Sequence, residues 1–209
     1  MSVNKSVTDY YKMYGKMQRW NLLSVSSFNL LFRLIRQNAL VLDVGCGIGY
    51  LSRLFSSYVG LDVNGLKIAR ELFPTTDYVC ASATHLPFRD NSFDVCIAYD
   101  CIEHINSTGR LLSEMARVSN KIFVGCVDFQ SWYQIVTRTI RLDRTHVFLP
   151  SREGLIKIVS KMLKIQKVYT TCGIFYLPRK LNRFFARFFP EYVLLECGKL
   201  GNYRRVFSE

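Results

Sequence analysis

The spacing of apolar and polar residues changes near residue 40. Between residues 8 and 37, apolar side chains such as Phe28, Leu31 and Leu34 recur at the 3.6-residue period of a helix. Residues 40–44 (LVLDV) then form a short, almost wholly apolar run that leads into glycines, which is typical of a strand buried on both faces. The pattern therefore predicts a helical N-terminal segment followed by a sheet.

Strand-like and helix-like segments alternate from there to residue 128. The predicted strands after the first lie at 58–62, 78–81, 93–98 and 122–127. The predicted helices begin at about residue 50 and span residues 64–72 and 108–118. Strands separated by helices indicate a parallel sheet with right-handed crossover connections.

The alternation is less regular beyond residue 128. Helices are expected over residues 131–141 and 151–163, the second with Ser151 as its N-cap. Two further strands are expected over 165–171 and 192–198. The chain has 209 residues and shows no repeat or linker, so we expect a single domain.

Charge is distributed unevenly along the chain. The formal net charge is +12, yet residues 61–128 carry 9 acidic and only 6 basic side chains. Residues 129–209 carry 15 basic and 5 acidic side chains. Such an excess suits an anionic partner, either nucleic acid or a membrane surface, and suits a solvated basic face equally well, so composition alone favours neither.

The seven cysteines form no CxxC pair and lie mostly within apolar runs, as expected for reduced thiols in a core. Residues 1–5 lack the apolar core of a signal peptide, and no run approaches the roughly 20 apolar residues that span a bilayer. We therefore expect a cytoplasmic protein, with peripheral membrane contact as an alternative.

Residues 43–49 (DVGCGIG) join the first predicted strand to a helix. Glycines let the backbone turn sharply against a ligand, and a helix N-terminus offers free N–H groups. A dinucleotide-binding loop would have a third glycine where Tyr50 stands, and Asp43 would repel a pyrophosphate but suits a cationic amino acid. Asp62, at the end of the second strand, is suited to accept hydrogen bonds from ribose hydroxyls. Another nucleotide remains an alternative.

Two motifs carry a family resemblance. Residues 41–49 (VLDVGCGIG) with 60–62 (GLD) resemble class I S-adenosylmethionine (SAM) methyltransferases, and 86–95 (LPFRDNSFDV) with 103–105 (EHI) resemble the group that includes the ubiquinone and menaquinone biosynthesis enzymes. The resemblance covers residues 40–128. It implies an α/β, Rossmann-like fold, whose seven-stranded, mostly parallel sheet has an antiparallel last strand and helices on both faces.

The resemblance also implies a division of the chain and a set of cofactor contacts. Residues 1–39 would form a helical cap, 40–128 the SAM-binding core, and 129–209 the acceptor-side helices and last two strands. Ser82 replaces the carboxylate that family members often present to the adenine amino group. The implied contacts are Asp43, Gly45 and Gly47 for the methionine part, Asp62 for the ribose, Val63, Ser82 and Ala83 for the adenine, and Tyr99 for the methyl donor.

Candidate catalytic residues follow the fourth strand. His104 could remove a proton from an acceptor hydroxyl or amine, because imidazole titrates near neutral pH, and Asp100 could reach the same pocket. Some relatives bind a divalent metal through Glu-x-x-Glu-His. Here the corresponding residues are Asp100, Glu103 and His104, with His146 as a further ligand, and Asp100 in place of the first Glu keeps an oxygen ligand of shorter reach. In metal-free relatives the Glu-His pair is mainly structural, so three interpretations stay open.

Two further segments bear on the acceptor. Tyr10, Tyr14 and Trp20 are placed on the substrate side together with His146, although the aromatic residues also suit packing on the sheet edge. Residues 179–190 show an apolar helical stripe opposite four basic side chains. This amphipathic helix could cover the substrate pocket, lie on a membrane or contact RNA.

The favoured function is SAM-dependent methyl transfer to a small-molecule or lipid-like acceptor, with S-adenosylhomocysteine (SAH) as the product. One alternative is an RNA methyltransferase that uses the basic C-terminal third. Another is a non-catalytic SAM-binding partner subunit.

Overall fold

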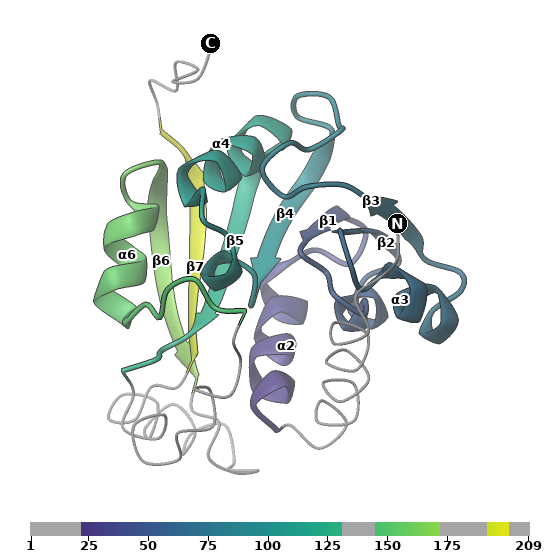
Figure 1. The fold of residues 1–209 in the computed structure, drawn as a ribbon, viewed down its shortest axis with the longest axis horizontal. Coiled ribbons are helices and arrows are strands. Elements are labelled where there is room, and N and C mark those ends of the chain that lie inside the picture. The colour runs from purple at the N-terminus through teal and green to yellow at the C-terminus, as the bar shows by residue number, and fades with distance from the viewer. Residues whose placement is uncertain (1–21, 131–144, 172–191, 201–209) are drawn as a thin grey trace.

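The computed structural model of this chain describes residues 22–130, 145–171 and 192–200. The described part contains four α-helices, two 3-10 helices and seven strands (Figure 1). The helices are α2 (Leu22–Leu34), η1 (Tyr50–Leu54), α3 (Leu66–Leu72), η2 (Ile102–His104), α4 (Thr108–Val118) and α6 (Arg152–Val159). The strands are β1 (Leu40–Val44), β2 (Ser57–Asp62), β3 (Asp77–Cys80), β4 (Phe93–Tyr99), β5 (Ser119–Val127), β6 (Leu163–Thr171) and β7 (Tyr192–Lys199).

The seven strands form one sheet in the order β3-β2-β1-β4-β5-β7-β6. The first five strands pair in parallel, and β7 lies antiparallel between β5 and β6. This arrangement confirms the predicted fold, including the antiparallel last strand. Figure 1 shows β3, β2 and α3 at one end of the sheet and β7, β6 and α6 at the other.

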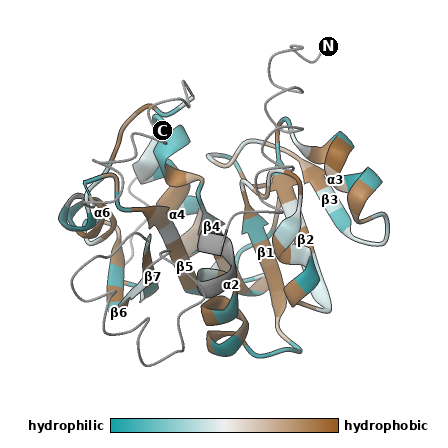
Figure 2. Cartoon of the chain, turned by 90° about the horizontal axis from the view of Figure 1, so that it is seen from below, coloured by the Kyte–Doolittle hydropathy of each residue, from teal (hydrophilic) through white to brown (hydrophobic). Residues whose placement is uncertain are grey.

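Side chains of the central strands alternate between two cores. Cys96 and Ala98 of β4 face the core that contains α4 and α6, whereas Val95 and Ile97 face the core that contains α2. The two sets differ because successive strand residues point to opposite sides of the pleat. In Figure 2 β5 is hydrophobic along most of its length, while α3 and α6 mix hydrophilic and hydrophobic residues. The sheet is therefore covered by helices on both faces.

Three predicted helices have different bounds in the structure. The segment after the glycine loop is a five-residue 3-10 helix rather than an α-helix. α3 begins at Leu66 instead of residue 64, and ahead of it the N–H groups of residues 64 and 65 donate to the Asp62 carboxylate. α6 ends at Val159, since Leu163 already pairs with Lys199 in β7. The Ser151 N-cap is confirmed: its hydroxyl accepts a 3.1 Å hydrogen bond from the Gly154 N–H.

Several predictions lie outside the described residues. These are the first part of the N-terminal helix with Tyr10, Tyr14 and Trp20, the helix over 131–141, and the amphipathic segment over 179–190. In the part of the chain that the structure describes, no helix is both long enough and apolar enough to cross a bilayer.

Candidate functional site

The sequence motifs meet at one edge of the sheet, where β3, β2, β1 and β4 end. The first four strands in the sheet order are parallel neighbours, so their carboxyl ends form a row. Asp62 is the last residue of β2, Asp43 the last but one of β1, and Tyr99 the last of β4, while Ser82 lies two residues beyond β3. The chain order reverses between β1 and β4, which is where open α/β sheets bind their ligands.

The glycine loop turns directly over the end of β1. Gly45 and Gly47 have left-handed backbone angles, with φ of 74° and 55°. A side chain at Gly45 would also collide with the Cys101 thiol. The Gly45 N–H donates to the Leu61 carbonyl at 2.7 Å, which holds the loop against β2. Glycine is needed here both for the backbone angle and for the close approach.

Asp43 is almost fully buried beneath this loop. One carboxylate oxygen accepts a 2.6 Å hydrogen bond from the Tyr58 hydroxyl. Among the described residues the other oxygen, Oδ1, has no hydrogen-bond partner. Burial raises the pKa of Asp43 to about 7; the Tyr58 hydrogen bond opposes that rise, and the nearby Asp62 charge adds to it. A cationic ligand group beside Oδ1 would stabilise the charged form.

Asp62 holds the loop and the start of α3 together. Its Oδ2 accepts from the Gly47 N–H at 2.9 Å, and its Oδ1 accepts from the N–H groups of Asn64 and Gly65 at 2.8 and 3.2 Å. A carboxylate has about four lone-pair sites, so acceptor capacity remains for a ligand hydroxyl. The residue thus has a structural role besides the predicted contact with ribose.

The predicted adenine-side residues surround the end of β3. Ala83 is buried, while Val63 is 56% exposed, and Ser82 is also exposed. The Ser82 hydroxyl lies 3.0 Å from the Thr84 hydroxyl and accepts a 3.3 Å hydrogen bond from the Thr84 N–H. An exposed apolar Val63 beside a hydroxyl-rich turn is consistent with an adenine platform, and the contact itself stays a prediction.

Tyr99 and Asp100 differ sharply in their surroundings. The Tyr99 hydroxyl is hydrogen-bonded to the Ser27 hydroxyl of α2, and its ring stacks on Tyr192 with centroids 4.7 Å apart. Asp100 has a left-handed φ of 49°, which is unusual for a residue other than glycine. Burial raises the pKa of Asp100 to about 7, although the Tyr192 hydroxyl opposes that rise. Tyr99 therefore supports the α2 side of the site, and its contact with the methyl donor remains predicted.

Glu103, His104 and His146 come together beside η2. One ligand atom from each lies within 4.8 Å of the others, and the two imidazole centroids are 4.6 Å apart. The His146 segment is attached to η2 by a 2.9 Å hydrogen bond from the Val147 N–H to the Glu103 carbonyl. Asp100 does not join this group within the described chain, so the structure unites three of the four residues of the predicted metal set.

The donor atoms of this cluster fit a divalent transition metal. One carboxylate and two imidazoles are common ligands of zinc and of iron, and the Thr145 hydroxyl lies 2.9 Å from His104 Nδ1 and so orients that ring. The same arrangement suits a general base. The geometry therefore strengthens both the base and the metal interpretation.

Four residues that contribute to this edge were not singled out from the sequence. Tyr58 binds Asp43, Tyr78 packs against Gly49 and Gly60, Tyr192 stacks on Tyr99, and Thr145 contacts His104. Tyr58 and Tyr78 lie on predicted strands, so knowledge of how these strands pair with their neighbours would have identified their contacts. Tyr192 and Thr145 are distant in sequence from their partners and had no recognisable local signal.

Comparisons with known proteins agree with this geometry. Residues 42–121 match the family model described as methyltransferase domain. Demethylmenaquinone methyltransferase of Renibacterium salmoninarum is 32% identical over 120 residues, which cover 54% of this chain and 48% of that protein. Phthiotriol/phenolphthiotriol dimycocerosates methyltransferase 1 of Mycobacterium ulcerans is 42% identical over 91 residues, which cover 37% of this chain and 32% of that protein. The match thus spans less than half the length of either relative.

The solved structure of a SAM-dependent methyltransferase from Thermotoga maritima has the same fold. Its TM-score is 0.70 at 17% identity, and the alignment covers 91% of this chain and 98% of that one. At this sequence identity the structural similarity shows a shared fold and nothing about activity. Residues 42–121 thus match a methyltransferase domain, and they lie within a sheet that has the fold of this solved methyltransferase.

Proposed function

We propose that this protein transfers the methyl group of SAM to a small-molecule or lipid-like acceptor. The observation that carries the proposal is the row of Asp43, the Gly45–Gly47 loop and Asp62 at adjoining strand ends of a methyltransferase domain. A buried carboxylate with a free oxygen suits the methionine ammonium, and a second carboxylate at the next strand end suits the ribose. The relatives named for quinone and lipid methylation support an apolar acceptor.

His104 is assigned as the general base in this proposal. The nucleophilic oxygen or nitrogen of the acceptor attacks the SAM methyl carbon, and the carbon–sulfur bond breaks to leave neutral SAH. The His104 imidazole takes the proton that the acceptor loses, while Thr145 orients the ring through Nδ1. The rest of the rate arises from alignment and from exclusion of water, since SAM is already a reactive donor.

The first test is ligand binding, followed by an acceptor screen. SAH and SAM should raise the melting temperature of the wild-type protein but not of Asp62→Ala. Labelled SAM is then incubated with separated lipid, small-molecule and RNA fractions of the source organism. Label in an extractable lipid or small molecule supports the proposal, whereas label in RNA supports the RNA alternative. SAH binding without transfer to any fraction would support a non-catalytic subunit.

A second candidate, favoured by the convergence of His146 on Glu103 and His104, is metal-assisted methyl transfer. When bound, a divalent cation would act as a Lewis acid that lowers the pKa of an acceptor hydroxyl. The three side chains would hold it through one carboxylate oxygen and two ring nitrogens. Metal analysis after dialysis against zinc, compared between wild type and His146→Ala, separates this candidate from the base mechanism: equal metal content in both would exclude it.

A further inference from the structure

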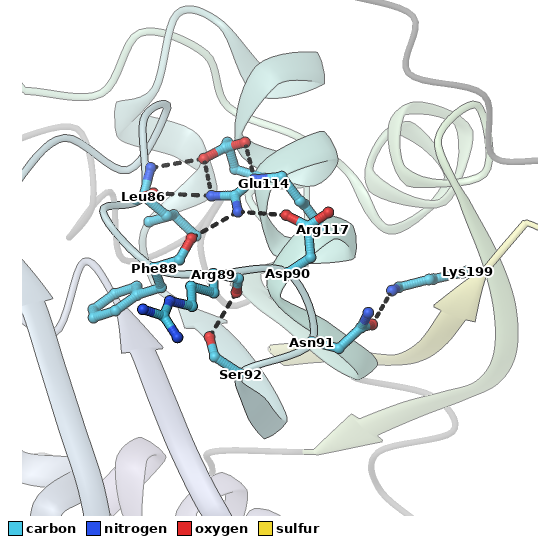
Figure 3. Close-up of polar contacts among 9 residues, drawn as sticks. All are labelled: Leu86, Phe88, Arg89, Asp90, Asn91, Ser92, Glu114, Arg117 and Lys199. Atoms are coloured by element: carbon cyan, nitrogen blue, oxygen red, sulfur yellow. Dashed lines mark hydrogen bonds and ion pairs between the residues drawn. The ribbon is translucent and has the colours of Figure 1, made fainter.

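The loop between β3 and β4, residues 81–92, consists of two parts held in different ways. In residues 81–85 the described hydrogen bonds are local, between Ser82, Thr84 and His85. Residues 86–92 are instead bound to α4 by a side-chain network (Figure 3). The first part carries the predicted adenine contacts. It begins at the end of β3, and the second part fixes the position at which it ends.

Arg117, in the last turn of α4, is the centre of this network. Its Nη2 donates to the Leu86 carbonyl at 2.9 Å, and its Nη1 donates to the Phe88 carbonyl at 2.7 Å and to Asp90 at 2.9 Å. Nε and Nη2 donate to the two oxygens of Glu114, at 2.7 and 2.8 Å. All five N–H donors of the guanidinium are thus used.

Glu114 completes the attachment at Leu86. Its Oε2 accepts a 2.8 Å hydrogen bond from the Leu86 N–H, while Arg117 binds the Leu86 carbonyl. Both backbone polar groups of this buried residue are therefore held by one ion pair on α4. The Arg117 hydrogen bond also holds the pKa of Glu114 below its usual value, so the pair is charged throughout the neutral range.

This attachment is more rigid than most surface ion pairs. Arg117 and Glu114 side chains are each 21% exposed, and the contacts are bidentate and continue into backbone carbonyls. Asn91 closes the far end of the loop: its N–H donates to the Arg117 carbonyl at 2.9 Å, and its side-chain oxygen accepts from Lys199 at 2.5 Å. A lysine at position 117 could replace the charge but not the planar fork.

We propose that Arg117 is a positioning residue for the cofactor: by fixing Leu86 through Glu114, it places Ser82 and Ala83 against the adenine of SAM. The inference rests on the proposed function, because it requires that the protein binds SAM at this edge. The guanidinium itself touches no part of the ligand and acts only through the loop.

The test compares ligand affinities of Arg117→Lys and wild type by calorimetry, at a temperature where both are fully folded. The expected result is about tenfold weaker binding of SAH, since two charge-assisted hydrogen bonds to the loop are lost. Methylthioadenosine, which lacks the amino acid part, should lose affinity by the same factor. Arg110→Lys, an exposed position on the same helix, and Tyr169→Phe, which removes the hydrogen bond to Glu196 in β7, should leave both affinities unchanged.

A merely structural role would lower the melting temperature of Arg117→Lys without changing either affinity, and that outcome would overturn the proposal. A loss of SAH binding without a matching loss for methylthioadenosine would also overturn it, because the effect would not act on the adenosine end. If Arg117→Lys does not fold, Glu114→Gln supplies the same comparison, with an expected loss of about threefold. Failure of the wild-type protein to bind SAH would instead reject the proposed function.

Discussion

The predicted cofactor edge (Asp43, Gly45–Gly47 and Asp62) and the predicted acceptor edge (Glu103, His104 and His146) of this protein are built in different ways. At the cofactor edge Asp62 ends β2 and Asp43 lies one residue before the end of β1, and their hydrogen bonds run to the adjacent loop or the adjoining strand. At the acceptor edge His104 and His146 lie 42 positions apart and meet because Val147 bonds to η2. The cofactor edge is therefore preorganised by local geometry, and the acceptor edge by long-range packing. Mutations at the two edges should accordingly affect different steps.

The largest effect is expected at the acceptor edge. His104→Ala should lower the rate of methyl transfer by about 10²- to 10⁴-fold, because the acceptor loses its general base, while SAH affinity remains within about twofold. His104→Gln keeps a side chain able to contact Thr145, and its rate of methyl transfer should fall by the same factor. Single-turnover transfer of labelled methyl and calorimetric SAH binding are the two measurements. Equal losses of rate and affinity would contradict the separation of the two edges.

The next effect concerns binding at the cofactor edge. Asp62→Ala should weaken SAH binding by about 100-fold or more, since it removes an acceptor for the ribose, one backbone hydrogen bond of the glycine loop and two ahead of α3. Asp62→Asn keeps one acceptor oxygen, so its SAH affinity should fall by a smaller factor. Asp77→Ala, at the exposed start of β3, serves as the control for removal of an acidic side chain. Wild-type affinity in Asp62→Ala would show that the ligand binds elsewhere.

A smaller effect should appear as a pH dependence of SAH binding. The pKa of Asp43 is about 7 in the free protein, and a bound ammonium group favours the carboxylate and so lowers it. Binding therefore releases a proton below about pH 7, and affinity should fall by up to about tenfold per pH unit there. Asp43→Asn should bind more weakly above pH 7 and should lose this dependence. Calorimetry between about pH 6 and 8 measures it, and an unchanged slope in the variant would exclude Asp43 as its source.

Asp43 should also lower the stability of the free protein as pH rises. Its pKa increases from the ordinary value of 3.8 to about 7 on folding, so the native state binds more protons than the unfolded state between these values. The contribution of Asp43 to stability is greatest below pH 4 and is lost as pH rises toward 7. Asp43→Asn should therefore raise the melting temperature above about pH 7 in the absence of ligand. A lower melting temperature at this pH would contradict the assignment.

The smallest effect is expected at Tyr58. Its hydroxyl donates to Asp43 and so lowers the pKa of that carboxyl. Tyr58→Phe should move the midpoint of the pH dependence of SAH binding upward, with little change in affinity well above that midpoint. Tyr169→Phe, which removes a tyrosine hydroxyl at the far edge of the sheet, is the matched control. A downward shift of this midpoint would mean that the Tyr58 hydroxyl does not lower the pKa of Asp43.

Much of the cofactor edge could be predicted from the sequence. The period of the apolar residues located all seven strands, and the glycine loop with Asp43 and Asp62 lay within about 20 residues of chain. These features are local, because a strand end, a turn and a helix start need only neighbouring residues. The helix bounds were less accurate: α3 begins at Leu66 rather than at residue 64, and the N–H groups of residues 64 and 65 donate to the Asp62 carboxylate ahead of the helix.

Tertiary structure decided what the local pattern left open. The sequence by itself predicted a parallel sheet with crossover helices, the glycine loop, and the acidic residues at or next to the ends of β1 and β2. Only the fold brought Tyr58 to Asp43, His146 to His104, and Arg117 to the Leu86 carbonyl. The physical reason is that these contacts join segments separated by 15 to 42 positions, whose distance depends on strand register and helix packing rather than on any local preference.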